Sequence, residues 1–183
     1  MARDIVAVAR AVDFAARKHA GQRRKGEAAE PYVNHLAEVA RLVAEATDGE
    51  DTVLVLGALL HDTIEDTQTG QSELEKEFGA EVAALVAEVT DDKTLPKAER
   101  KRLQVEKAPH KSARAKMIKL ADKTSNLRSM AASPPVDWDW KRQSEYFEWA
   151  GRVADGCRGV NALLERWFDE AHASGIAALG RRR

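Results

Sequence analysis

The chain has 183 residues, of which 44% are hydrophobic and 32% are charged, as in a globular protein of one domain. Its 29 basic and 30 acidic side chains nearly cancel, which argues against a protein that coats nucleic acid or a membrane surface through charge. The N-terminus lacks a secretion signal, and no apolar run approaches the ~18 residues of a membrane helix, so we expect a cytoplasmic protein. The single cysteine, Cys157, excludes an intrachain disulfide and a cysteine-based metal site.

Apolar residues recur at helical spacing along almost the whole chain, and the alternation typical of strands is missing. The first expected helix turns four residues toward the core: Ile5, Val8, Val12 and Ala16. A polar segment, residues 21–31, ends this helix, and a second helix is expected over residues 35–46.

The third expected helix, residues 53–62, is apolar on every side, which predicts a central and buried position. Asp51 or Thr52 can cap its N-terminus. Ser72 and Glu75 have the spacing of a capping box for the helix that ends near Gly79.

Further helices are expected over residues 80–89, 97–107 and 112–130, with one or two more between residues 138 and 178. Because strand patterns are missing, we expect an all-α fold in a single domain, residues 1–183. Its core should span about residues 5–170, and the C-terminal arginines Arg181, Arg182 and Arg183 should be frayed.

Six ionisable residues are expected at or near buried helix positions: His35, His61, Asp62, Glu65, Asp66 and Asp122. Burying such groups is unfavourable unless partners or a metal ion compensate. Imidazoles and carboxylates together form a nitrogen and oxygen donor set, which suits Mn²⁺, Fe²⁺, Co²⁺ or Zn²⁺ better than Ca²⁺. Separate capping or salt-bridging roles for these side chains are the alternative.

Four of these residues, His35, His61, Asp62 and Asp122, resemble the metal signature of the HD superfamily. More narrowly, residues 61–66 (HDTIED) resemble the active-site block of the RelA/SpoT-type alarmone hydrolases. Similar segments extend over nearly the whole chain: residues 14–19 (FAARKH), 31–35 (PYVNH), 89–93 (VTDDK) and 119–123 (KLADK). Residues 94–106 are especially similar to the small, hydrolase-only branch that includes the metazoan homologue.

The resemblance implies an orthogonal helical bundle of the HD-domain, phosphodiesterase-like type, without a synthetase region. It implies hydrolysis of guanosine 3′,5′-bis(diphosphate), ppGpp or pppGpp, to GDP or GTP and pyrophosphate. It also implies one Mn²⁺ ion held by the four residues of the metal signature, with Glu65 and Asp66 as the catalytic pair that orients and deprotonates water. N-capping of the next helix is the alternative role of this pair.

Asn126 lies four residues after Asp122 on the same helix face, where it can hydrogen-bond the ribose or a phosphate. Arg24 and Lys25 precede His35 in a basic loop. The resemblance implies that these two residues bind the pyrophosphate and that Arg24 stacks on guanine. A solvated basic loop is the alternative.

Three more residues are assigned to a distal phosphate or the base: Lys97, Arg142 and Tyr146. A core stripe of Arg142, Tyr146 and Trp149 is the alternative. Thr124 and Ser125 stand where the family usually has bulky residues, which predicts a roomier or more polar pocket beside the nucleoside.

Three rival functions remain open from the sequence. The first is an HD phosphohydrolase that acts on another nucleotide, such as the 2′-phosphate of NADPH. The second is a non-catalytic nucleotide sensor, against which Glu65 and Asp66 count. The third is a protein-interaction bundle, which would leave the ionisable cluster without a role. The native metal, the preferred alarmone and the oligomeric state are not determined by the sequence.

Overall fold

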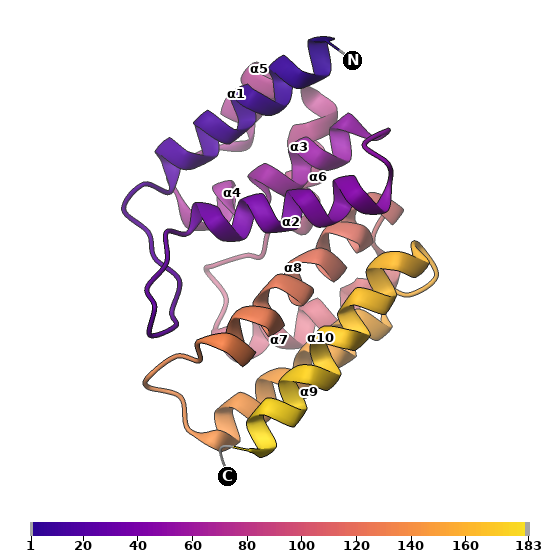
Figure 1. Cartoon of the computed structure of the whole chain (residues 1–183). Helices are drawn as coiled ribbons and strands as arrows, with labels where there is room; N and C mark the ends of the chain where they lie inside the picture. The colour runs from indigo at the N-terminus through magenta and orange to yellow at the C-terminus, as the bar shows by residue number, and fades with distance from the viewer. Residues whose placement is uncertain (1, 182–183) are drawn as a thin grey trace.

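The computed structural model describes residues 2–181, and these residues form α-helices and one short 3₁₀ turn without a named strand (Figure 1). The elements are α1 (Ala2–Lys18), α2 (Val33–Ala46), α3 (Thr52–Leu60), α4 (Thr63–Asp66), α5 (Gln71–Phe78), α6 (Ala80–Val89), α7 (Lys97–Lys107), η1 (Ala108–His110), α8 (Ala113–Ala132), α9 (Trp140–Asp155) and α10 (Ala162–Gly180). The expected all-α class is confirmed. Arg182 and Arg183, two of the three arginines expected to fray, lie outside the described residues.

The long helix α8 lies in the middle of the molecule (Figure 1). It packs against α2, α3 and α6 on one side and against α9 and α10 on the other. Buried apolar side chains from α1 to α10 form one continuous core. Within the part of the chain that the structure describes, no helix is long and apolar enough to cross a membrane.

Helix α3 is buried from Leu54 to Leu60, which confirms that the most apolar helix is central. The carboxylate of Asp51 caps it by accepting a 3.0 Å hydrogen bond from the amide of Leu54. Gly57 allows the close approach of neighbouring helices, because a Cβ there would lie 2.6 Å from the side chain of Leu85 on α6. The end of this helix therefore reaches the interior, where His61 and Asp62 follow.

The inner face of α1 differs from the prediction. Ile5 and Val12 are 67% and 43% exposed, whereas Ala11, Phe14 and Ala15 are buried. The ring of Phe14 packs edge-on against Phe78, with 5.3 Å between ring centroids. The large ring decides which face turns inward, and the two alanines let α1 approach α3 closely.

Two boundaries also differ from the prediction. The helix α5 begins at Gln71 with Gly70 at its N-cap position, so Ser72 already lies inside the helix and cannot form the expected capping box. At the other end, Leu179 on α10 is buried. The core therefore extends beyond residue 170, where it was expected to end.

Candidate active site

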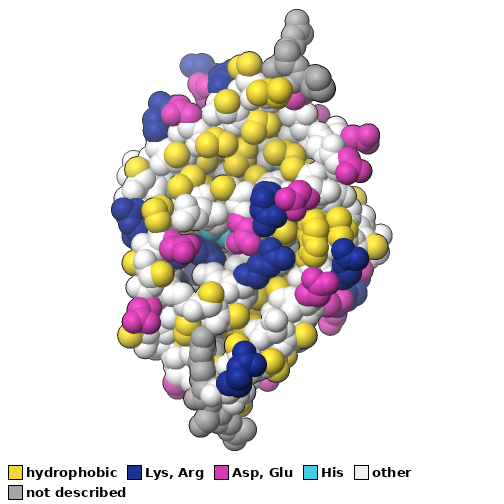
Figure 2. All heavy atoms as spheres, viewed as in Figure 1, with side chains coloured by type: hydrophobic (Ala, Val, Ile, Leu, Met, Phe, Trp, Pro, Cys, Tyr) yellow, Lys and Arg dark blue, Asp and Glu magenta, His cyan; other side chains and the backbone are white. Residues whose placement is uncertain are grey.

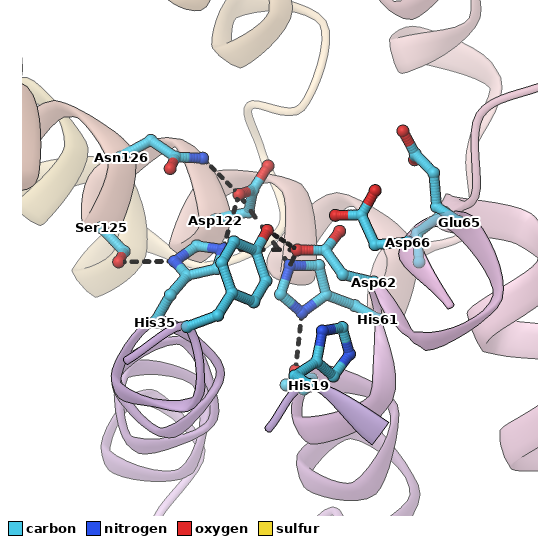
Figure 3. Close-up of polar contacts among 12 residues, drawn as sticks. His19, His35, His61, Asp62, Glu65, Asp66, Asp122, Ser125 and Asn126 are labelled. Carbon is cyan, nitrogen blue, oxygen red and sulfur yellow. Dashed lines mark hydrogen bonds and ion pairs between the residues drawn. The ribbon is translucent and has the colours of Figure 1, made fainter. Parts of the chain in front are cut away.

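Four of the predicted site residues converge where α2, α3 and α8 meet (Figure 3). His35 comes from α2, His61 and Asp62 directly follow α3, and Asp122 comes from the middle of α8. Nε2 of His35 lies 3.6 Å from Oδ2 of Asp62 and 3.4 Å from Oδ1 of Asp122. Nε2 of His61 lies 3.1 Å and 3.9 Å from the same two oxygens. Donor atoms of His35, His61 and Asp62 lie within 4.8 Å of one another, a spacing at which one metal ion can bind all three.

The ring of His61 is oriented by the backbone. Its Nδ1 lies 2.8 Å from the carbonyl oxygen of Ala58, which can only accept, so Nδ1 carries a proton. Its Nε2 is buried and lies 3.1 Å from Oδ2 of Asp62, but within the described residues its geometry to this oxygen is not that of a hydrogen bond. Buried polar atoms normally have a partner. A buried ring nitrogen that faces carboxylate oxygens without hydrogen-bond geometry fits the donor set of a divalent cation.

The ionisable groups of this cluster lie close enough to shift one another's pKa. Burial disfavours the charged form of His61, but Asp62 and Asp122 outweigh it and raise the pKa of His61 to about 9. Burial likewise disfavours ionisation of Asp62, but the nearby imidazoles outweigh it and lower the pKa of Asp62. A proton on His61 thus balances part of the carboxylate charge, and a cation that binds there must displace it.

Three residues outside the predicted set orient side chains of the cluster, two of them a carboxylate and one an imidazole. Tyr32 donates to Oδ2 of Asp62 at 2.6 Å, and Lys123 donates to Oδ2 of Asp122 at 2.8 Å. Ser125 lies 2.8 Å from Nδ1 of His35. Tyr32 and Lys123 belong to the segments PYVNH and KLADK, but only the fold brings their side chains to the carboxylates.

Glu65 and Asp66 lie on the short helix α4, beside the cluster. Oε2 of Glu65 accepts a 3.1 Å hydrogen bond from the amide of Asp91, and burial raises the pKa of Glu65. The carboxylate of Asp66 contacts Lys93. Because Gly70 is the N-cap of α5, neither carboxylate caps that helix, and the N-capping alternative is excluded.

A cavity of about 720 Å³ opens beside the cluster. Asn126 connects the two, because it donates to Oδ1 of Asp122 at 2.6 Å and accepts from Arg24 at 3.1 Å. An isolated antiparallel β-bridge between Gly26 and Pro135 holds the basic loop, which contains Arg24 and Lys25, beside this cavity. The lining is rich in side chains that bind anions or stack on rings: Arg23, Arg24, Lys25, Lys93, Lys97, Arg100, Lys101, Trp138, Tyr146 and Trp149.

The far wall of the cavity combines cations with aromatic rings. Lys97 and Arg142 lie over the ring of Trp138, at 5.7 Å and 4.5 Å from its centroid. Burial and the neighbouring cations lower the pKa of Lys97. Arg142 also pairs with Asp137 at 3.7 Å and is not among the residues that line the cavity. Of the three predicted residues, Lys97 and Tyr146 therefore line the cavity, whereas Arg142 contacts the ring of the lining residue Trp138.

Thr124 and Ser125 were expected to make the pocket beside the nucleoside roomier or more polar. Thr124 borders neither of the two cavities of this region, whereas Ser125 borders one of them. Thr124 is fully buried and donates a 2.8 Å hydrogen bond to the carbonyl of Leu120 in its own helix, and it lines neither cavity. Ser125 lines a second cavity of about 240 Å³, where α2 and α8 meet. Only the second of the two small residues therefore makes room near the site.

Comparisons with known proteins agree with this geometry. The family model of the HD domain matches residues 11–147. Guanosine-3′,5′-bis(diphosphate) 3′-pyrophosphohydrolase MESH1 of Homo sapiens is 56% identical over 85% of this chain and 87% of that protein. The protein of the same name from Drosophila melanogaster is 48% identical over 87% of this chain and 89% of its own length.

Two solved structures extend the similarity to the fold. One is described as a metazoan ortholog of SpoT that hydrolyzes ppGpp. It matches with a TM-score of 0.87 and 46% identity, and covers 90% of this chain and 93% of that chain. The crystal structure of lmo0812 from Listeria monocytogenes matches with a TM-score of 0.65 and 30% identity, over 80% of this chain and 99% of that chain.

Proposed function

The chain belongs to the HD domain family, and from its similarity to guanosine-3′,5′-bis(diphosphate) hydrolases of this family we propose that it hydrolyses the same compound to GDP and pyrophosphate. The pentaphosphate would give GTP in the same way. The observation that carries the proposal is the junction of a buried His and Asp cluster with a cavity rich in cations. Such a cavity favours a substrate with several phosphates.

The cluster fits a divalent metal ion. We assign His35, His61, Asp62 and Asp122 as its ligands, and Mn²⁺ as the ion. Two observations support this assignment: Nε2 of His61 is buried without hydrogen-bond geometry, and the donors combine nitrogen and oxygen. When bound, the ion supplies Lewis-acid chemistry toward a phosphate oxygen and makes water more acidic.

Glu65 and Asp66 are assigned to the attacking water. Because burial raises the pKa of Glu65, its carboxylate is more basic than an ordinary glutamate and suits the removal of a proton from water. Asp66 lies next to it, fixed through Lys93 and through a 2.7 Å hydrogen bond from Gln22 to its backbone oxygen. In the reaction the water oxygen forms a bond to the phosphorus attached to the 3′ oxygen while Glu65 takes a proton from this water. The bond between that phosphorus and the 3′ oxygen breaks, and the proton passes to the 3′ oxygen, so that pyrophosphate and GDP are released.

The remaining predicted residues bind the substrate. Arg24 and Lys25 hold the 3′-pyrophosphate, with Arg24 kept in place by its 3.1 Å hydrogen bond to Asn126. Lys97, Arg142 and Tyr146 serve the distal phosphates or the base. Arg142 acts from the rim by stacking on Trp138, since it does not line the cavity.

A product assay tests the proposal directly. Purified protein with Mn²⁺ is incubated with guanosine 3′,5′-bis(diphosphate) and, separately, with NADPH. Products are separated by anion-exchange chromatography. We expect GDP and intact pyrophosphate from the alarmone. Release of inorganic phosphate from NADPH at a much higher rate would instead assign the site to the rival 2′-phosphatase.

A further inference from the structure

The two buried imidazoles of the cluster are oriented by different kinds of hydrogen-bond partner. Nδ1 of His61 faces the carbonyl oxygen of Ala58, which can only accept. Nδ1 of His35 lies 2.8 Å from Oγ of Ser125, a hydroxyl that can donate as well as accept. The backbone therefore decides which nitrogen of His61 is protonated, whereas His35 needs a further group to decide this.

That group is Glu38, three residues after His35 on α2. Ser125 donates to Oε2 of Glu38 at 2.7 Å, and Arg128 donates to Oε1 at 3.1 Å. Burial disfavours ionisation of Glu38, but the hydrogen bonds from Ser125 and Arg128 outweigh it and lower the pKa of Glu38. An ionised carboxylate only accepts, so the single hydroxyl hydrogen of Ser125 must point toward Glu38.

The direction of this hydrogen bond fixes the next one. A lone pair of the Ser125 oxygen faces Nδ1 of His35, so Nδ1 carries the proton. Nε2 of His35 then keeps its lone pair, and it lies 3.4 Å from Oδ1 of Asp122 inside the cluster. Only an unprotonated ring nitrogen can bind a metal ion.

We propose that Glu38 and Ser125 are positioning residues that hold His35 in the tautomer that binds the cation. The inference rests on the metal site of the proposed function. Both residues line the second cavity, which also contains His35 and Arg128. Figure 2 shows a histidine side chain in a hollow bordered by acidic and basic side chains, and in Figure 3 Ser125 and the pair Glu65 and Asp66 lie on opposite sides of His35. The arrangement therefore lies on the side of His35 away from the catalytic pair.

Glu38→Gln tests the direction of the hydrogen bonds that link Glu38, Ser125 and His35, and it keeps the shape of the side chain. The amide oxygen should accept from Arg128, so the amide nitrogen should donate to Ser125. The hydroxyl hydrogen can then turn to His35, which favours the tautomer protonated at Nε2. We expect the Kd for Mn²⁺, measured by isothermal titration calorimetry, to rise roughly 10- to 100-fold.

NMR spectroscopy detects the tautomer of His35 directly. Long-range ¹H–¹⁵N correlation spectra of the wild-type protein, metal-free and loaded with Zn²⁺, should show a protonated Nδ1 and an unprotonated Nε2 at His35. In metal-free Glu38→Gln the other tautomer should appear. A role in packing alone would leave these ring signals unchanged.

Hydroxyl removal and rescue complete the test. Ser125→Ala should weaken Mn²⁺ binding to a similar extent, and Ser125→Thr should restore it. Thr124→Ala is the matched control, because it removes a buried hydroxyl from the neighbouring position that bonds only its own helix. An unchanged Kd and unchanged ring signals in Glu38→Gln would overturn the inference and leave the proposed function intact. A wild-type chain that binds neither Mn²⁺ nor Zn²⁺ would remove the metal site, and the inference with it.

Discussion

The phenol of Tyr32 donates a 2.6 Å hydrogen bond to Oδ2 of Asp62. The same oxygen lies 3.1 Å from Nε2 of His61, so one atom meets a donor that directly precedes α2 and an imidazole that directly follows α3. Burial and the nearby Asp62 raise the pKa of Tyr32, which keeps its hydroxyl protonated and able to donate. The bond therefore holds the Asp62 carboxylate in the direction that a metal ligand needs.

Tyr32→Phe removes this hydrogen bond and keeps the ring that stacks on His19. We expect the Kd for Mn²⁺ to rise roughly 10-fold, because partners of metal ligands typically contribute at least this much to metal affinity. Calorimetric titration of the purified variant measures it. Equal affinity in the variant and the wild type would show that the packing of Asp62 alone fixes its orientation.

Asp122→Asn should abolish stable metal binding. The side chain keeps its shape but loses the charge that the ligand set needs, and Lys123 loses its buried partner. Elemental analysis after gel filtration should find about one metal ion in the wild type and little in the variant. Asp169→Asn is the control, because this carboxylate pairs with Arg158 at the surface. Full metal content in Asp122→Asn would contradict the assignment.

Glu65→Gln and Asp66→Asn should separate chemistry from binding. Glu65 bonds the amide of Asp91 and Asp66 pairs with Lys93, outside the His and Asp cluster, so both variants should keep the metal. Their kcat should fall by roughly 10²-fold or more, as expected when a general base is removed. Steady-state kinetics combined with metal analysis measures both properties. Glu73→Gln, which changes a carboxylate that pairs with Lys18, serves as the control.

The rate should fall at mildly acidic pH because of Glu65. A general base works only when deprotonated, and burial raises the pKa of Glu65 above its ordinary value. Its loss of activity on acidification should therefore begin at a higher pH than for an exposed glutamate, about 4.3. Titration of the Glu65 carboxyl carbon by ¹³C NMR separates this effect from loss of metal. A midpoint at or below the ordinary value would be the contrary result.

The sequence predicted the helices well where local signals are strong. The buried α3, its Asp51 cap and the limits of α6 and α7 follow from apolar runs and from residues that begin or end helices. The inner face of α1 was predicted wrongly, because Phe14 and Phe78 are far apart in sequence and only packing pairs them. Local periodicity cannot identify such a partner.

The candidate site, like the fold, was predicted from the sequence only in part. Spacing and resemblance identified the six ionisable residues, and the fold brings four of them together. The partners Tyr32, Glu38 and Ser125 were not predicted, because each acts through a hydrogen bond to a residue 30 or more positions away in the chain. Tyr32 lies in the family-like segment PYVNH and Ser125 at a position where the family has a bulky residue, but neither signal indicates which side chain these residues contact.

Arg24→Ala should change substrate binding more than chemistry. The guanidinium lines the cavity and bonds Asn126, so it is held ready for a phosphate. A hydrogen bond to a charged group contributes roughly 1.5–3 kcal/mol, so KM for guanosine 3′,5′-bis(diphosphate) should rise roughly 10- to 100-fold while kcat changes little. Arg17→Ala, which removes an exposed arginine paired with Asp13, should change neither constant.

A shorter substrate shows which phosphate Arg24 binds. An analogue with a single 3′-phosphate lacks the outer phosphate, so the wild type should already bind it more weakly, and Arg24→Ala should add little to that loss. Anion-exchange chromatography follows the products of both substrates. If Arg24→Ala weakens both substrates equally, Arg24 contacts the inner phosphate or the base instead. If the tetraphosphate yields only inorganic monophosphate, the bond that is cut is not the one at the 3′ oxygen.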